Sequence, residues 1–226
     1  MICRDLRRKE PNRFLIADNI AMEIWTSDPN GDHATRLTSF AGPVTGSPRW
    51  LPDGQQIVFD SRASGQSEIY SISVKGGQPQ RLTNNPEADV VPTWSPDGHW
   101  IYFNSLRSGQ SQIWRMLPDG SGATQITRSG GFAPTLSPDG RWVYYTKNRK
   151  AVAPLWRVPY EGGKERGGAP SRSESGVSAY GNGDLLFHFR GKKPALHTTV
   201  SGVQNRPDRN YRTDFKTGTE RFDYFA

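Results

Sequence analysis

A short segment recurs along this chain at a nearly fixed interval. It reads SPRWLPDG from Ser47, PTWSPDG from Pro92 and PTLSPDG from Pro134. The glycines of the three PDG triplets stand at positions 54, 98 and 140, so the spacings are 44 and 42 residues. A repeat in the low forties is typical of a β-propeller blade, in which each repeat folds as four short strands.

The residues between the turns support four strands per repeat. Each PDG is followed by an apolar run, and a second β-rich run and a short closing run come after a polar loop and a Gly-rich turn. Examples are Ile57–Phe59, Ile69–Ile72 and Gln80–Thr83 in one repeat, and Ile101–Phe103, Ile113–Met116 and Gln125–Thr127 in the next. Runs rich in Val, Ile, Tyr, Trp and Thr, separated by Asp-Gly and Gly-Gly, predict antiparallel strands joined by tight hairpins. We name these strands A to D from the propeller axis outward.

The predicted fold is therefore all-β, a β-propeller of four-stranded antiparallel blades with a period of 42–45 residues. About four to five blades are expected, and we favour an incomplete propeller or a fragment of a larger one over a small ring closed by the tail. The predicted divisions are a basic N-terminal segment (1–12), propeller repeats (13–165) and a degenerate last blade with a poorly ordered basic tail (166–226). The repeats comprise a partial blade without strand A (13–46) and three full blades (47–90, 91–133, 134–165). Within the last division, residues 183–189 are predicted to form a final strand.

The PxWSPDG turn, the IYF-type strand and the SG loop resemble the TolB-like, WD40-like propeller repeat of bacteria. The resemblance covers roughly residues 14–164. It implies a module that senses or binds a protein or peptide partner, as TolB does in the cell envelope. It also leaves open a fusion to a DNA-binding or kinase domain in a longer parent protein. Relatives of this kind can hold a calcium ion near the axis; otherwise no cofactor is expected.

The formal net charge of +7 invites a nucleic-acid hypothesis, but its distribution argues against one. Residues 14–156 contain 12 Lys/Arg and 12 Asp/Glu, so the excess positive charge lies in the two ends of the chain. We therefore expect no nucleic-acid binding by the propeller itself. One cysteine, Cys3, excludes an internal disulfide. The sequence also shows neither a secretory signal nor an apolar run long enough for a membrane span, and the compartment stays open.

Strand direction alternates, so the B–C and D–A loops are predicted to share one face, opposite the A–B and C–D turns. Loops on a rigid scaffold are the usual place for recognition. The candidate partner-binding residues on this face are Asp60, Arg62, Asn85, Glu87, Asp89, Asn104, Arg107 and Arg128. Arg62 and Arg107 repeat at nearly one blade spacing, 45 residues, and their pairing with acids would equally serve to tie neighbouring blades together.

No catalytic or metal motif accompanies the repeats. The chain lacks a G-x-S-x-G elbow, a P-loop and an H-E-x-x-H pair, and its four histidines fall at unrelated repeat positions. The Asp residues of the PDG turns are expected to hold the hairpin backbone, and the run from Asp28 to Asp32 is expected to be a turn. The favoured function is a non-catalytic interaction or sensor module. The alternatives are a substrate-gating propeller of a prolyl-oligopeptidase-like peptidase and a propeller enzyme such as a lyase or lactonase.

Overall fold

The computed structural model of the protein describes residues 2–4, 14–17, 23–28, 32–147, 154–167, 176–179 and 185–188. All the regular structure in these residues is β. No helix in this part of the chain is long and apolar enough to cross a membrane. The predicted all-β propeller of four-stranded antiparallel blades is confirmed.

The strands follow the chain order of the blades. Blade 1 contains β1 (Ile2–Arg4), β2 (Phe14–Ala17), β3 (Ile24–Ser27) and β4 (Thr35–Arg36). Blade 2 contains β5 (Thr45–Trp50), β6 (Gln56–Ser61), β7 (Glu68–Ser73) and β8 (Gln80–Arg81). Blade 3 contains β9 (Asp89–Trp94), β10 (Ile101–Ser105), β11 (Gln112–Met116) and β12 (Thr124–Gln125). Blade 4 contains β13 (Phe132–Leu136), β14 (Trp142–Thr146), β15 (Leu155–Pro159) and β16 (Arg166–Gly167), and a hairpin of β17 (Gly176–Ala179) and β18 (Leu185–His188) follows.

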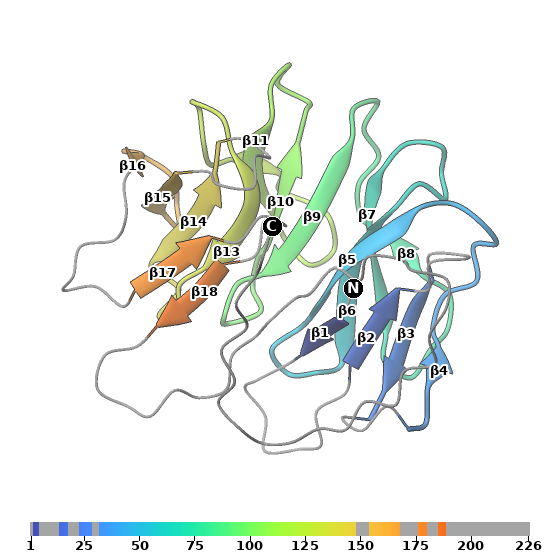
Figure 1. Ribbon diagram of the computed structural model, residues 1–226. Coiled ribbons are helices and arrows are strands. Elements are labelled where there is room, and N and C mark those ends of the chain that lie inside the picture. The colour runs from blue at the N-terminus through green and yellow to red at the C-terminus, as the bar shows by residue number, and fades with distance from the viewer. Residues whose placement is uncertain are drawn as a thin grey trace, which may run out of the picture.

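In each blade the strands pair antiparallel in sequence order, so A to D run from one side of the sheet to the other. The A strands of consecutive blades contact one another, β5 with β9 and β9 with β13. Figure 1 shows the four sheets side by side around a common centre, with β5, β9 and β13 toward the middle and β4 and β16 toward the outside. This arrangement is the radial stacking that the repeat predicts.

Blade 1 differs from the prediction in one detail. The expected partial blade lacks strand A, but β1 pairs with β2 through Ile2 opposite Ile16 and Arg4 opposite Phe14. The sequence pattern misses this strand because three residues joined by backbone hydrogen bonds need no PDG turn or apolar run. The A strands of the other blades begin at Thr45, Asp89 and Phe132, slightly upstream of the predicted blade starts.

The three PDG turns have the predicted local structure. Their glycines Gly54, Gly98 and Gly140 have φ angles of 70°, 74° and 72°. Residues with a side chain rarely adopt this left-handed conformation, whereas glycine does so readily. The Asp carboxylates accept hydrogen bonds from the amide two residues on, for example His99 N to Asp97 Oδ1 at 3.0 Å and Arg141 N to Asp139 Oδ1 at 3.0 Å. The expected role of these aspartates in the hairpin backbone is confirmed.

The core of the molecule consists of apolar clusters between blades. The cluster between blades 2 and 3 combines Val58 and Ile69 with Ile101 and Phe103, all fully buried. Equivalent clusters join blades 1 and 2 and blades 3 and 4. Burying one such side chain contributes roughly 1.5–3 kcal/mol, so stability depends on the stacking of neighbours and not on single blades.

The last predicted strand is present in part, since β18 falls within residues 183–189 and pairs with β17. The polar tail after residue 189 lies outside the described residues, as does most of the segment 1–12.

Candidate interaction face

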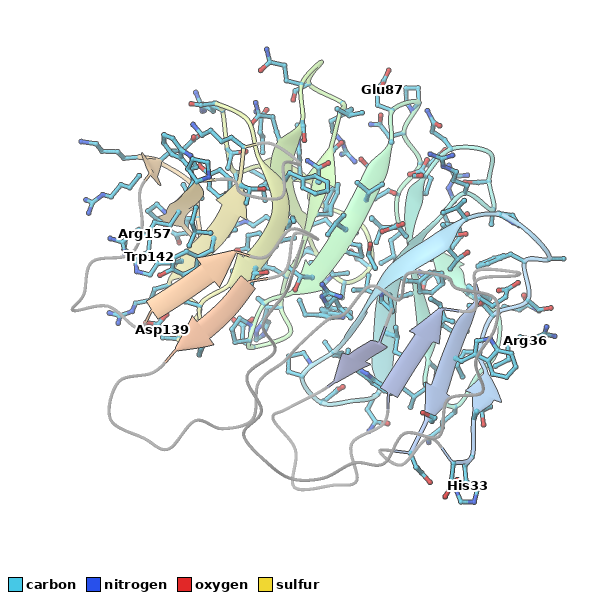
Figure 2. All side chains as sticks on the ribbon, in the orientation of Figure 1. His33, Arg36, Glu87, Asp139, Trp142 and Arg157 are labelled. Carbon is cyan, nitrogen blue, oxygen red and sulfur yellow. The ribbon has the colours of Figure 1, made fainter. Side chains whose placement is uncertain are left out.

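The loops of the propeller lie on two opposite faces. Figure 2 shows Glu87, in a D–A loop, at the top of the view, while His33 in a C–D turn and Asp139 in an A–B turn lie toward the bottom. We call the side formed by the B–C and D–A loops the interaction face. The candidate residues lie at the ends of the A and B strands and in the B–C and D–A loops that form this face.

The candidates differ widely in accessibility. Asp60, Asp89 and Asn104 are buried, and Asn85 and Arg107 are half-buried. Arg62, Glu87 and Arg128 are exposed. Only part of the predicted set can therefore present its side chain to a partner without rearrangement.

Asp60 connects two blades. Its carboxylate, on β6, accepts a hydrogen bond from the amide of Val91 on β9 at 2.9 Å. Val91 has a φ angle of 54°, which is strained for a β-branched residue. Burial raises the pKa of Asp60, against the opposing effects of the Val91 amide, the Ser47 hydroxyl and the charges of Arg49 and Arg62. The residue therefore holds the bulge of the next blade's A strand in place.

Asn104 is the residue of blade 3 that matches Asp60, because Asp60 lies opposite Ile69 and Asn104 lies opposite Ile113. Its amide nitrogen donates to the hydroxyl of Ser111 at 2.7 Å and to the carbonyl of Gly131 at 2.7 Å. These bonds are internal, and they join the B strand to the loop that leads into blade 4.

Asp89 and Arg107 form an ion pair of 2.6 Å between their Oδ2 and Nη2 atoms. Burial raises the pKa of Asp89, while the Ser105 hydroxyl and Arg107 oppose that shift. The Arg107 guanidinium also lies over the ring of Trp114, 4.9 Å from its centroid. The pair stabilises the junction of β9 with the B–C loop inside one blade and does not bridge neighbouring blades.

Arg62 and Arg107 do not occupy equivalent positions. The amide of Arg62 donates to the carbonyl of Val44 at 2.9 Å, and in the next blade it is the Leu106 amide that donates to Ala88, at 3.2 Å. Arg107 therefore matches Ala63. The spacing of 45 residues suggests a repeat, but the two blades are offset by 44 residues at this point.

The sequence interpretation missed a set of buried side chains that hold the D–A loops. Glu23, Glu68 and Gln112 stand at the start of the C strands and are 1%, 0% and 3% exposed. Each accepts a hydrogen bond from the threonine that follows the D strand of its blade, namely Thr38, Thr83 and Thr127. Each also accepts one from a D–A loop amide, at 2.9 to 3.1 Å, from Ala41, Asn85 and Gly130. The signal was present as a Glu or Gln directly before each Ile-aromatic pair, with a Thr after each Leu or Ile of the closing run.

The loop that carries Arg128 has a second clamp. Glu165 of blade 4 accepts hydrogen bonds from the amides of Arg128 at 2.6 Å and Ser129 at 3.0 Å. Lys147 pairs with the same carboxylate at 3.1 Å. Burial alone would raise the pKa of Glu165, but these donors outweigh it and the pKa is lowered. The Arg128 backbone is thus fixed while its side chain remains exposed.

The sequence model of the TolB β-propeller domain matches residues 18–208. The chain belongs to the TolB β-propeller domain family. A protein of Agrobacterium tumefaciens described as a TolB has a similar structure, with a TM-score of 0.62 and 27% identity over 69% of this chain and 60% of that one. The TolB of Acinetobacter baumannii also has a TM-score of 0.62, at 24% identity over 80% of this chain and 46% of that one.

An uncharacterised protein of Agrobacterium fabrum is 42% identical over 70 residues, which are 31% of this chain and 24% of that protein. This TolB-family chain thus spans about half of the two TolB structures and a quarter of the Agrobacterium fabrum relative.

The described part of the TolB-family propeller contains no group of three or more His, Cys, Asp or Glu side chains able to hold a metal ion. The run from Asp28 to Asp32, which is expected to be a turn, is described only at its two ends. There the Asp28 amide donates to the Asp32 carbonyl at 2.9 Å, and His33 pairs with the Asp28 carboxylate at 2.7 Å. These contacts are those of a turn.

Proposed function

We propose that this TolB-family propeller is a non-catalytic module that binds a protein or peptide partner through its interaction face. The single observation that carries the proposal is the internal clamping of the D–A loops by Glu23, Glu68 and Gln112. A loop held from within by buried acceptors keeps its outward side chains in one arrangement. Such preorganisation reduces the entropy lost on binding.

The exposed members of the candidate set lie around these clamped loops. Arg62 lies in the B–C loop of blade 2, Glu87 in the loop between blades 2 and 3, and Arg128 in the loop between blades 3 and 4. A protein or peptide that spans three consecutive blades would contact all of them. The proposed binding needs no cofactor, and no observation in the described residues favours peptidase gating or propeller catalysis over it.

The test is site-specific photo-crosslinking in cells that express the full chain. A benzophenone amino acid replaces Arg62 or Glu87 on the interaction face, and His33 or Asp139 on the opposite face serves as the matched control. We expect one protein species to be trapped from positions 62 and 87 and not from 33 or 139. Trapping from the control positions alone, equal trapping from all four, or no trapping from 62 and 87 would overturn the proposal.

A further inference from the structure

The ion pairs of the interaction face all have the same orientation with respect to solvent. The side chains of Glu68 and Arg81 are 0% and 35% exposed, and those of Asp89 and Arg107 are 0% and 17% exposed. The Glu165 and Lys147 side chains follow the same order, at 10% and 23%. In each pair the carboxylate lies inside and the cation is turned toward solvent.

The remaining charges of this face strengthen the asymmetry. Glu23 and Asp60 are buried and accept hydrogen bonds from within the protein. Arg62 and Arg128 are exposed, and neither forms an ion pair with a carboxylate among the described residues. Glu87 is the exposed acid among the candidate residues. Most acids of the face thus serve the fold, whereas Glu87, Arg62 and Arg128 reach solvent. The Nε of Arg62 donates to the Ser67 hydroxyl at 3.2 Å, which leaves its two terminal nitrogens for a ligand.

The opposite face differs in the exposure of its carboxylates. Its ion pairs, His33 with Asp28, His99 with Asp97 and Arg141 with Asp139, leave the carboxylates 34%, 61% and 46% exposed, beside cations that are 84%, 77% and 77% exposed. The hydroxyl of Ser137 and the Arg141 amide hold the pKa of Asp139 at about 2, so this carboxylate stays ionised. The interaction face therefore buries the carboxylates of its ion pairs and turns the cations toward solvent, whereas the opposite face exposes carboxylates and cations together.

We propose that the partner segment bound by the interaction face is an acidic peptide whose Asp or Glu side chains pair with Arg62 and Arg128. This inference rests on the proposed function and specifies the chemistry of its ligand. A guanidinium fits a carboxylate with two parallel hydrogen bonds, and complementary charge guides such an encounter. The solvent-facing parts of Arg81 and Arg107, 35% and 17% exposed, lie on the same face.

The surface is better suited to a peptide than to a nucleic acid. Proteins that bind single strands combine basic grooves with exposed aromatic rings on which bases stack. The exposed large apolar side chains of the described residues are Val44, Leu117 and Tyr160. Tyr160 is the aromatic among them, and it belongs to a C–D turn on the opposite face. Within the described residues, then, the interaction face has no exposed aromatic platform.

The experiment measures the binding of a fluorescein-labelled hexaglutamate peptide to the full chain by fluorescence anisotropy at low and at moderate salt. The test variant is Arg62→Glu/Arg128→Glu. The control, Lys75→Glu/Arg141→Glu, makes the same change in net charge on the opposite face. We expect the test variant to bind about tenfold more weakly, with a smaller loss on adding salt, and the control to bind like the unmodified protein. The basic ends of the chain contribute equally to all three proteins.

Several outcomes would overturn the inference: no binding by the unmodified protein, equal weakening in both double variants, or no weakening in the test variant. Tighter binding of an oligo(dT) strand that is lost in the test variant would assign the face to nucleic acid instead. Thermal melting identifies any variant that is misfolded, and the neutral Arg62→Gln/Arg128→Gln protein then replaces it. Crosslinks from position 87 together with hexaglutamate binding that is unchanged in the test variant would support the proposed function. The same result would contradict the inference that the ligand is acidic.

Discussion

Asp60 and Asn104 occupy matching positions in consecutive blades, and only the first carries a charge. Burial raises the pKa of Asp60 above its ordinary value of 3.8. The folded protein therefore binds this proton more tightly than the unfolded chain does. This contribution to stability is lost as the pH rises from 3.8 through the raised pKa, and it remains absent at neutral pH.

We accordingly expect Asp60→Asn to increase the free energy of unfolding at pH 7 by about 1 kcal/mol and to flatten its pH dependence in the acid range. The asparagine oxygen still accepts the Val91 amide, and no charge is buried. Urea unfolding at several pH values measures both effects. A loss of stability at pH 7 would show that the charges of Arg49 and Arg62 outweigh the cost of burying the carboxylate.

At the scale of elements, the C–D turns contact the preceding blade. Gly120, in the turn between β11 and β12, has a φ angle of 90°, and a Cβ at this position would overlap the carbonyl oxygen of Leu82 in blade 2. Gly65, in the B–C loop of blade 2, has a φ angle of 96° with nothing within 4 Å of its missing Cβ. Both glycines have a positive φ angle that a residue with a side chain would adopt only with strain. Only at Gly120 would an added Cβ also meet a neighbouring blade.

Replacing each with alanine separates these effects. Gly65→Ala is expected to cost about 1–2 kcal/mol, the penalty of an L-residue in a left-handed conformation. Gly120→Ala is expected to cost more, because the turn must also move away from blade 2 and open the cluster around Leu82. Chemical denaturation of both variants measures the difference. Equal losses would mean that the turn shifts freely and does not help to hold the blades together.

At the scale of the whole molecule, stability is a property of neighbouring blades. Phe59 is fully buried in the cluster between blades 1 and 2, which contains no residue of blade 4. Truncating it to alanine removes apolar contact and leaves a cavity, at a cost of roughly 3–5 kcal/mol. In a stack where each repeat contacts its neighbours, the loss is expected to be local.

Hydrogen exchange on Phe59→Ala should show faster exchange in β6 and β7 and unchanged exchange in β14 and β15. Tyr145→Ala, in the cluster between blades 3 and 4, is the matched control with the opposite pattern. Uniform acceleration in all four blades would show instead that the propeller unfolds as one unit.

Much of the architecture was predictable because it depends on local chemistry repeated in register. The PDG glycines, the Asp side chains of the turns and the apolar runs determine hairpins within about ten residues, and their period determines the stacking. β1 was missed, since a three-residue strand carries no such local pattern. The interaction face followed from strand direction alone, while the clamping residues Glu23, Glu68 and Gln112 left a signal in the sequence that was not used.

The amino-acid sequence by itself determined the blade, its turns and the family, because those features are encoded in short segments. Tertiary structure alone decided which candidate side chains reach solvent. Asp60, Asp89 and Asn104 are turned inward by contacts with segments distant in sequence, while Arg62 and Arg128 are not. The count of charges over residues 14–156 is neutral, and such a count cannot distinguish a carboxylate desolvated between blades from a guanidinium in water. Only the fold sorts these charges by depth and by face, and that sorting buries Asp60 and Asp89 on the interaction face while Arg62 and Arg128 reach solvent.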